Sequence, residues 1–398
     1  MGQSTFPAPS TGASYSSQPP ANASSVLLDG SLVNSASYST TLTGTGASWL
    51  LYANGGGTTT ITVAGTPYTV TAGSTVGTVA LTGSKSVTIA TTYTPPSTFT
   101  ASTMPSSSYW TSVTYGNGYY VAVQAYGTTA GAYSTNGTSW TASTMPSAST
   151  WVGVTSGNGY FVAIANGPTT AGAYSTNGTT WTASTMPSSA NWNAVTYGNG
   201  YFVAVAYGTT AGAYSTNGTT WTASTMPSSA NWTAVTYGNG YYVAVATGTT
   251  TGAYSTNGIS WTVLTMPSAS AWYGVTYGNG YYVAVASGTT AGAYSTNGTS
   301  WTASTLPSSS NWYSVTYGNG YFVAVAYSTT AGAYSTNGTT WTASTLPSSA
   351  NWNAVTYGNG YFVAVAGSVI SPTTAGAYFA QTAIPVTYGI YNGPTATH

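Results

Sequence analysis

The feature that most constrains this chain is a tryptophan that returns at nearly constant intervals. Internal repeats of this length are typical of small units that must stack on copies of themselves to bury an apolar face. A period near 40 residues fits four short strands, which is the content of one blade of a β-propeller. Steps of 41, 41, 40, 40, 40 and 40 residues separate Trp110, Trp151, Trp192, Trp232, Trp272, Trp312 and Trp352.

Each unit contains four expected strands separated by turn signals. The second strand of the unit at Trp192 reads YFVAVA, and such an apolar run must be covered on both faces. Asn-Gly pairs are strong hairpin signals, and a further turn is expected at 208–210. Pro227 lies in the loop that returns to the next tryptophan, where its missing N–H costs nothing. The strands of this unit are expected at 192–197, 201–206, 213–216 and 219–224.

The two ends of the array complete each other. Six units carry a second tryptophan in the fourth expected strand, but the seventh loses this pattern after Tyr378. Upstream of the first unit, Phe99–Pro105 reads FTASTMP and matches the WTASTMP of the fourth strands. We therefore expect Phe99–Thr103 to pair with the strand that contains Tyr378. The predicted fold is all-β: a seven-bladed propeller of four-stranded blades, closed by an N-terminal strand so that no sheet edge stays open.

The sequence outside the repeat divides into further parts. Residues 1–25 are rich in Ser, Pro and Ala and are expected to form an extended anchoring arm, threaded onto a partner or folded back on its own chain. Residues 26–93 alternate apolar and polar positions between Gly-rich turns, which is typical of a small antiparallel β-sandwich or barrel. Asp29 and Lys85 fall in its turns and are expected to be structural or solvated. The expected domains are an arm at 1–25, a β-domain at 26–93, a linker at 94–98, the propeller at 99–383 and a C-terminal tail at 384–398.

Charged side chains are almost absent from the chain. Its 398 residues include one Lys or Arg, one Asp or Glu, one His and no Cys, and residues 99–383 contain none of these. This composition excludes a basic nucleic-acid footprint, a pair of catalytic carboxylates and a cysteine or histidine metal site in the propeller. We expect no enzymatic activity, no cofactor, no metal and no membrane span. The chain is 42% hydrophobic and 14% aromatic, which argues against disorder.

The segment STNGTTW resembles the Asp-box, or BNR-like, repeat, whose pattern is Ser-x-Asp-x-Gly-x-x-Trp on the hairpin between the third and fourth strands of propeller blades. Here Asn replaces Asp, and one residue is missing before the glycine. The resemblance implies a structural role away from any active site. Some Asp-box propellers are sialidases, but those need arginines and carboxylates that 99–383 lacks. The box residues are Asn136, Trp140, Asn177, Trp181, Asn217, Trp221, Asn257, Trp261, Asn297, Trp301, Asn337 and Trp341.

The units differ from one another mainly next to the leading tryptophan and in the loop between the second and third strands. In a four-stranded meander these positions share one face, whereas the constant Asn-Gly turns share the other. We expect the varied face to bind a ligand, because Tyr and Asn side chains suit neutral sugars. The alternative is drift in solvent-exposed loops. The candidate ligand-binding residues are Tyr109, Tyr126, Asn193, Tyr207, Tyr273, Tyr313, Tyr327 and Asn353.

The whole unit also resembles repeats of phage virion proteins and of bacterial surface proteins. Residues 1–25 have neither the basic start nor the apolar run of a secretory signal. We therefore expect a non-enzymatic virion protein, made in a host cytoplasm and attached to other virion proteins through the arm and β-domain. Head decoration, head fibre and tail fibre stay open, as do homo-oligomerisation and adhesion to host-surface carbohydrate. A bacterial lectin-like extracellular adhesin is the alternative. A consensus-designed propeller is a third possibility, against which the 41-residue units and the extra domain argue.

Overall fold

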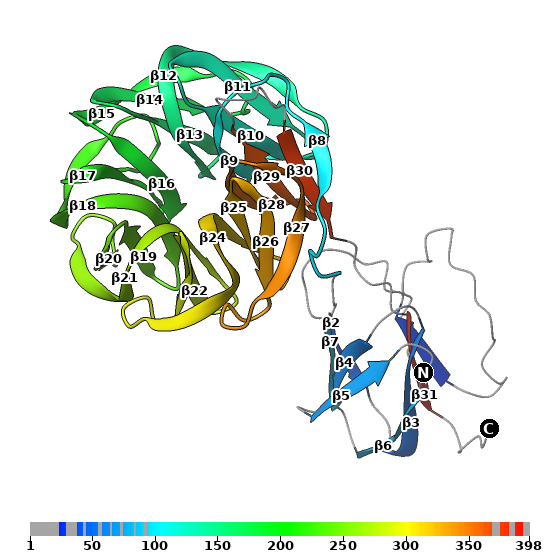
Figure 1. The fold of residues 1–398 in the computed structure, drawn as a ribbon. Helices are drawn as coiled ribbons and strands as arrows, with labels where there is room; N and C mark the ends of the chain where they lie inside the picture. The colour runs from blue at the N-terminus through cyan, green and yellow to red at the C-terminus, as the bar shows by residue number, and fades with distance from the viewer. Residues whose placement is uncertain are drawn as a thin grey trace. The chain divides into compact units, whose positions relative to one another are not determined.

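Each repeat forms an antiparallel four-stranded sheet, and seven such sheets follow one another around a ring in the computed structural model (Figure 1). The fourth strand of one blade often continues directly into the first strand of the next. The strands of the whole ring are β8 (Thr100–Thr103), β9 (Trp110–Gly116), β10 (Tyr119–Gln124), β11 (Thr128–Ser134), β12 (Thr141–Gly157), β13 (Tyr160–Asn166), β14 (Thr169–Ser175), β15 (Thr182–Ala190), β16 (Trp192–Gly198), β17 (Tyr201–Ser215), β18 (Thr222–Gly238), β19 (Tyr241–Ala246), β20 (Thr249–Ser255), β21 (Thr262–Gly278), β22 (Tyr281–Ser287), β23 (Thr289–Ser295), β24 (Thr302–Gly318), β25 (Tyr321–Tyr327), β26 (Thr329–Ser335), β27 (Thr342–Ala350), β28 (Trp352–Gly358), β29 (Tyr361–Ala366) and β30 (Ala375–Ala380).

The structure describes residues 94–367 and 375–381 in full. It describes the strands at 24–28, 38–42, 45–54, 58–63, 66–71, 75–82, 85–90 and 387–392 by their backbone alone. Every regular element in this described part is a β-strand, and none of it forms a helix suited to crossing a membrane. The chain separates into two units, Pro95–Gln381 and a smaller one made of Met1–Thr94 with Thr382–His398.

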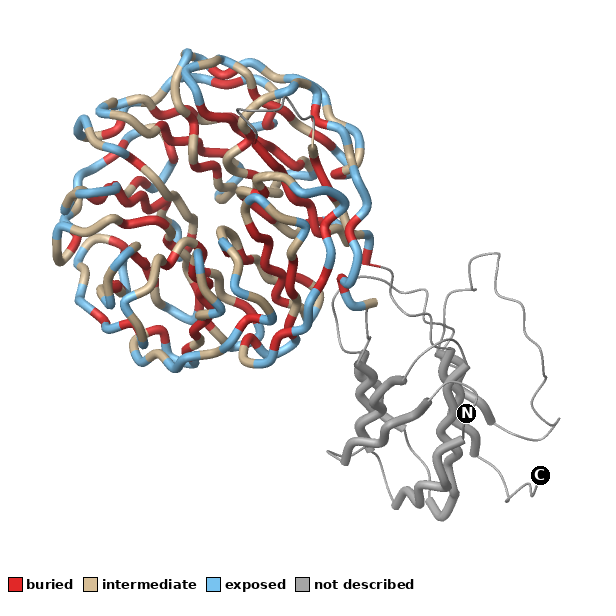
Figure 2. Tube along the Cα trace, viewed as in Figure 1, coloured by how far each residue is buried: buried red, intermediate tan, exposed pale blue. Residues whose placement is uncertain are grey.

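The second strand of each blade is the apolar centre of the propeller. In β13 the five residues after Tyr160 are all fully buried, and the same pattern recurs in the other blades. The leading tryptophans are fully buried as well. Figure 2 shows the buried segments inside the ring and the exposed segments along its outer rim. The core is therefore divided into one apolar layer between each pair of neighbouring sheets, as the two-sided burial of YFVAVA requires.

Three details of the blade differ from the sequence prediction. The turn expected at 208–210 lies inside β17, which runs from Tyr201 to Ser215 with shifts in its pairing register on either side of Thr209. The fourth strand begins at Thr222 rather than at 219, because the N–H groups of Thr219 and Thr220 donate to Asn217 Oδ1 instead of joining the ladder. The strand then runs through Pro227, which was expected in a loop. Its partner register jumps there, from Thr225 opposite Ala211 to Ala230 opposite Thr209. Residues 226–229 form a bulge, so the proline still replaces no ladder hydrogen bond.

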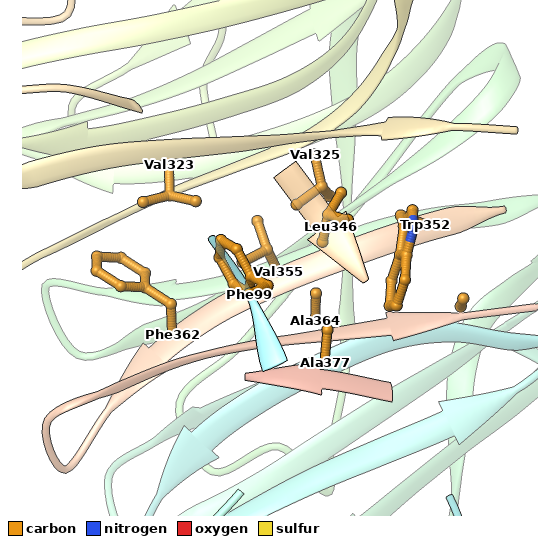
Figure 3. Packing of buried hydrophobic residues seen from close by; sticks show 10 residues of the cluster. Phe99, Val323, Val325, Leu346, Trp352, Val355, Phe362, Ala364 and Ala377 are labelled. Atoms are coloured by element: carbon orange, nitrogen blue, oxygen red, sulfur yellow. The ribbon is translucent and has the colours of Figure 1, made fainter. Parts of the chain in front are cut away.

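The last blade is completed by the segment that precedes the first one. β8 pairs antiparallel with β30, with Thr100 opposite Tyr378, as the sequence predicts (Figure 1). Phe99 is 3% exposed and packs with Leu346, Trp352 and Val355 (Figure 3). Its ring centroid lies 6.0 Å from that of Phe379. Phe99 therefore takes the place of the second tryptophan, and the ring closes without an open edge.

The smaller unit consists of two four-stranded sheets, in the orders β1-β31-β3-β6 and β2-β7-β4-β5. The C-terminal segment supplies the strand between β1 and β3, so the smaller unit takes strands from both sides of the propeller in the sequence. Lys85 begins a strand rather than lying in the expected turn. Asp29 and most of the predicted arm, 1–25, lie outside the described residues. The strands are β1 (Ser24–Leu28), β2 (Tyr38–Leu42), β3 (Thr45–Asn54), β4 (Thr58–Val63), β5 (Thr66–Thr71), β6 (Thr75–Thr82), β7 (Lys85–Ala90) and β31 (Thr387–Asn392).

Candidate functional site at the mouth of the central channel

The innermost strands surround a central cavity of about 220 Å³. It is lined by the two or three residues that follow each leading tryptophan. The second of these is always small, such as Gly153 or Ala194, and the third is a valine, such as Val154. The first varies between blades and lies at the end of the cavity where the innermost strands begin, which we call the channel mouth. The varied positions after the tryptophans therefore line this mouth and do not lie in solvent-exposed loops.

Short polar side chains at the mouth join neighbouring blades, and we call these contacts polar clips. In each, a side-chain donor bonds the main-chain oxygen of the next blade's leading tryptophan. Val152 has no donor, and at its junction Asn166 Nδ2 bonds the carbonyl of Trp192 at 3.4 Å instead. The other four are Thr111 Oγ1 to Trp151 O at 2.7 Å, Asn193 Nδ2 to Trp232 O at 3.1 Å, Thr233 Oγ1 to Trp272 O at 2.6 Å and Asn353 Nδ2 to Trp110 O at 2.7 Å.

The clips change how two candidate ligand-binding residues are interpreted. Asn193 and Asn353 each use the side-chain amide nitrogen within the ring, so the structure gives them a role in joining blades. The sequence analysis missed the matching roles of Thr111, Asn166 and Thr233. A short polar residue directly after the tryptophan was the available signal. The acceptor carbonyl belongs to the neighbouring blade, however, and no pattern within one repeat reveals it.

Tyrosines replace the clips on one side of the mouth. Tyr273 stacks on Tyr313, with ring centroids 4.4 Å apart and planes 12° from parallel, and Tyr313 stacks on Tyr327 at 4.7 Å and 20°. The Tyr109 hydroxyl donates to the Tyr327 hydroxyl at 3.4 Å. Tyr109 in turn meets Tyr126 edge to face at 5.0 Å. These five residues, which we call the tyrosine arc, bring together five of the eight predicted ligand-binding residues from the first, fifth and sixth blades.

Two hydroxyls of the arc have raised pKa values. Burial raises the pKa of Tyr109, and the hydrogen bond with Tyr327 and the neighbouring tyrosines raise it further. Burial likewise raises the pKa of Tyr313, with Tyr273 as the next largest cause. The arc therefore offers uncharged aromatic surfaces and neutral hydroxyl groups that can both donate and accept hydrogen bonds.

Tyr126 is the exposed end of the arc and has an unusual backbone. Its side chain is 60% exposed and its φ is 73°, a left-handed conformation that costs a bulky L-residue roughly 1 kcal/mol. Ala125 N bonds Tyr109 O just as Tyr207 N bonds Asn191 O in the third blade. The loop of the first blade therefore has two residues, Tyr126 and Gly127, where the third blade has Gly208 alone, and this makes the first unit 41 residues long. Tyr207, 40% exposed in the corresponding loop of the third blade, lies outside the arc.

The box residues on the opposite side of the blades have structural contacts. Asn136 Oδ1 accepts hydrogen bonds from the Ser134 hydroxyl and from the N–H groups of Thr138 and Ser139, each at 3.0 Å. The same set recurs at Asn177, Asn217, Asn257, Asn297 and Asn337. The glycine after the box asparagine has the positive φ, at 72° for Gly137, and a Cβ there would meet Val363 of the neighbouring blade at 2.5 Å. The box asparagine thus supplies the acceptor that holds this turn.

The box tryptophans differ in burial from blade to blade. Trp181, Trp221 and Trp341 are buried, whereas Trp140, Trp261 and Trp301 are partly exposed. All six pack between blades with the apolar residues of the second strands. The described residues also contain no group of three or more His, Cys, Asp or Glu that could hold a metal ion. The chemistry left to this part of the chain is that of aromatic rings, amides and hydroxyls.

Comparison with known proteins identifies the fold. Virginiamycin B lyase from Staphylococcus aureus superposes with a TM-score of 0.61 at 12% identity, covering 74% of this chain and 99% of that one. YCF48 from Cyanidioschyzon merolae gives 0.53 at 13% identity, covering 74% and 98%. The chain has a β-propeller fold. The similarity at this identity concerns the fold alone. No protein-family model and no curated protein sequence matches the chain.

Proposed function

We propose that this chain is a non-enzymatic structural protein of a phage particle, which displays its propeller on the particle surface as a head decoration, head fibre or tail fibre. The observation that carries the proposal is the chemistry of the propeller, which has no acidic, basic, imidazole or thiol side chain between residues 99 and 383. Such a surface lacks the charge repulsion that keeps free proteins apart at high concentration. It suits a protein fixed in an assembly.

The same composition argues against catalysis at the channel mouth. One structure of the S. aureus lyase is described as a catalytically inactive histidine-to-alanine variant, so that enzyme depends on a histidine. The single histidine here is His398, outside the propeller unit. Glycoside hydrolysis normally requires two carboxylates, and acid–base catalysis in general needs a group that titrates near the working pH. Burial raises the pKa values of Tyr109 and Tyr313 in the arc away from that range.

The internal contacts that hold the propeller together also support a display role. Its turns are held by side-chain hydrogen bonds that repeat from blade to blade, and its ring closes through β8. Neither feature requires a bound ligand or a charged partner. Attachment would then fall to the arm at 1–25 and to the smaller unit, and the propeller would carry any adhesion to host-surface carbohydrate.

The test is to find the protein in purified particles. We expect mass spectrometry of phage particles from a producing host to detect the chain at a fixed ratio to the major capsid or tail protein. Antibody against the propeller should label the particle surface in electron micrographs. A chain lacking residues 1–23, which leaves β1 whole, should fold but fail to incorporate. Absence from all particles would overturn the proposal, and location on an uninfected bacterial surface would favour a lectin-like adhesin instead.

A further inference from the structure

We infer that the tyrosine arc is a binding site for a neutral saccharide, with Tyr126 as the ring on which one sugar stacks. The inference rests on the proposed function only for its biological purpose, because binding can be measured on the purified chain. Among the eight candidate residues, it assigns the site to Tyr109, Tyr126, Tyr273, Tyr313 and Tyr327. Asn193 and Asn353 are left to the polar clips and Tyr207 to the solvent-exposed surface of the third blade.

Tyrosines are concentrated on one side of a ring that is otherwise repetitive. Tyr109 and Tyr327 are 218 residues apart in sequence, yet their hydroxyls lie 3.4 Å from each other. Elsewhere around the mouth the equivalent positions carry Thr, Val or Asn. Blade joining alone does not require this change, since the clips achieve it with much smaller side chains. The arc thus provides an aromatic surface beyond what the ring needs.

Tyr126 has a backbone conformation that is costly for its residue type. The residue lies in a loop one residue longer than that of the 40-residue third unit, and its φ equals the 73° of Gly208 in that loop, a conformation that glycine adopts without strain. Backbone outliers of this kind cluster at ligand sites, where the surrounding structure holds them in place. Here the strain keeps a 60% exposed aromatic ring beside the mouth, with its contact to Tyr109 made edge to face. An edge-to-face contact leaves a broad ring surface open for a ligand.

The chemistry of the arc points to one class of ligand. Ring stacking is available at Tyr126, and the hydroxyls of the arc are neutral donors and acceptors whose pKa values at Tyr109 and Tyr313 are raised by burial. No charged side chain lies in the propeller unit to pair with a phosphate, sulfate, carboxylate or ammonium group. Neutral sugars match both properties, since their C–H faces are apolar and their hydroxyls form hydrogen bonds.

Binding and stability can be separated by the choice of variant. Tyr126→Gly removes the ring and relieves the left-handed strain, so it should leave the thermal unfolding midpoint unchanged or raise it while weakening binding about tenfold or more. Tyr126→Phe keeps the ring and should retain binding within about threefold. Tyr207→Ala is the matched control, because it removes an exposed tyrosine from the corresponding loop of another blade.

The experiment uses the full chain and saturation-transfer NMR with maltoheptaose, cellohexaose, chitohexaose and laminarihexaose, together with hyaluronan and polygalacturonate as acidic probes. We expect at least one neutral oligosaccharide to bind in a manner sensitive to Tyr126→Gly and insensitive to Tyr207→Ala. Binding of none of the neutral probes, preference for the acidic ones, or equal losses in both variants would overturn the inference. So would Tyr126-dependent binding of a peptide with the proline-containing sequence of residues 1–23 in the absence of sugar binding. None of these results would alter whether the chain is found in particles.

Discussion

Two sides of the same channel mouth join their blades by different means. At five of the seven junctions a Thr or Asn side chain bonds the carbonyl of the next leading tryptophan. At the junction that follows Tyr273, its ring stacks on Tyr313 of the next blade. At the junction that follows Tyr313, which stacks on Tyr327 of its own blade, Ser314 Oγ accepts a hydrogen bond from Val355 N at 3.1 Å. A net hydrogen bond and an aromatic pair each contribute on the order of 1 kcal/mol. The two solutions are therefore close in stability, and they differ in what they present to a ligand.

The residues along the innermost strand differ in how strongly packing constrains them. The leading tryptophan, the small residue and the valine recur because they fill space between sheets. The first residue after the tryptophan needs only a contact that holds neighbouring blades together, so its residue type can vary. Variation there is the place where a function can be added without altering the fold.

The largest expected effect tests whether the two sides share the same core. Trp192 and Trp312 are both fully buried, and their Nε1 atoms donate to Ser188 O at 3.2 Å and to Ser308 O at 3.1 Å. Replacing either by alanine should lower the free energy of unfolding by about 3–5 kcal/mol. Denaturant unfolding of the full chain, followed by circular dichroism, measures both. If the losses of unfolding free energy in the two variants differ by more than about 2 kcal/mol, the two sides differ in their buried cores as well as at the mouth.

The next effect tests the clips themselves. Thr233 is 9% exposed, and its hydroxyl contacts Val245 O at 3.1 Å and Trp272 O at 2.6 Å. Thr233→Val keeps the shape but leaves buried carbonyls without that donor, and should cost about 1–3 kcal/mol. Thr222→Val, at an exposed position of the same strand, should stay within about 0.5 kcal/mol of the original chain. Equal costs at both sites would mean that the clip adds nothing to stability.

The core of the fold could be predicted from the sequence because its determinants lie within one repeat. The tryptophan spacing gives the number of blades, YFVAVA gives the buried strand, and the match of Phe99–Pro105 to the fourth strands gives the closure. The C-terminal strand β31 could not be predicted in the same way. It pairs with β1 and β3, more than 300 residues away in sequence, and no repeated pattern marks that pairing.

The site could be predicted only in part, for a related reason. Five of the eight proposed ligand-binding residues lie together in the arc, because large aromatics in positions that vary between repeats are an informative signal. Asn193 and Asn353 were grouped with them because an amide suits both a sugar and a carbonyl. Which one it meets depends on the neighbouring blade's backbone, about 40 residues or a full ring away, and not on the residue type.

A smaller effect appears only at high pH and should come from the tyrosine side. Burial raises the pKa of Tyr313 above its usual value of 10.0. The unfolded chain therefore ionises at this residue first, and its contribution to stability is fully present below pH 10, then lost as the pH rises through the folded-state pKa. Tyr313→Phe should move the midpoint of alkaline unfolding to higher pH, whereas Thr233→Val should lower stability equally at pH 8 and pH 11. A midpoint unmoved by Tyr313→Phe would contradict the assigned burial.

The smallest expected effect on stability comes from replacing a tyrosine of the arc by the threonine found in two of the polar clips. In Tyr273→Thr the new hydroxyl stands where Thr111 and Thr233 stand in their blades, and it can bond the carbonyl of Trp312. The lost stack on Tyr313 and the gained clip should offset each other to within about 1 kcal/mol. Tyr273→Ala loses the stack and gains no donor, so it should be the less stable of the two in the same urea titration. If the threonine variant is no more stable than the alanine variant, the mouth positions are not interchangeable, and the tyrosines are needed for joining blades as well as for whatever they bind.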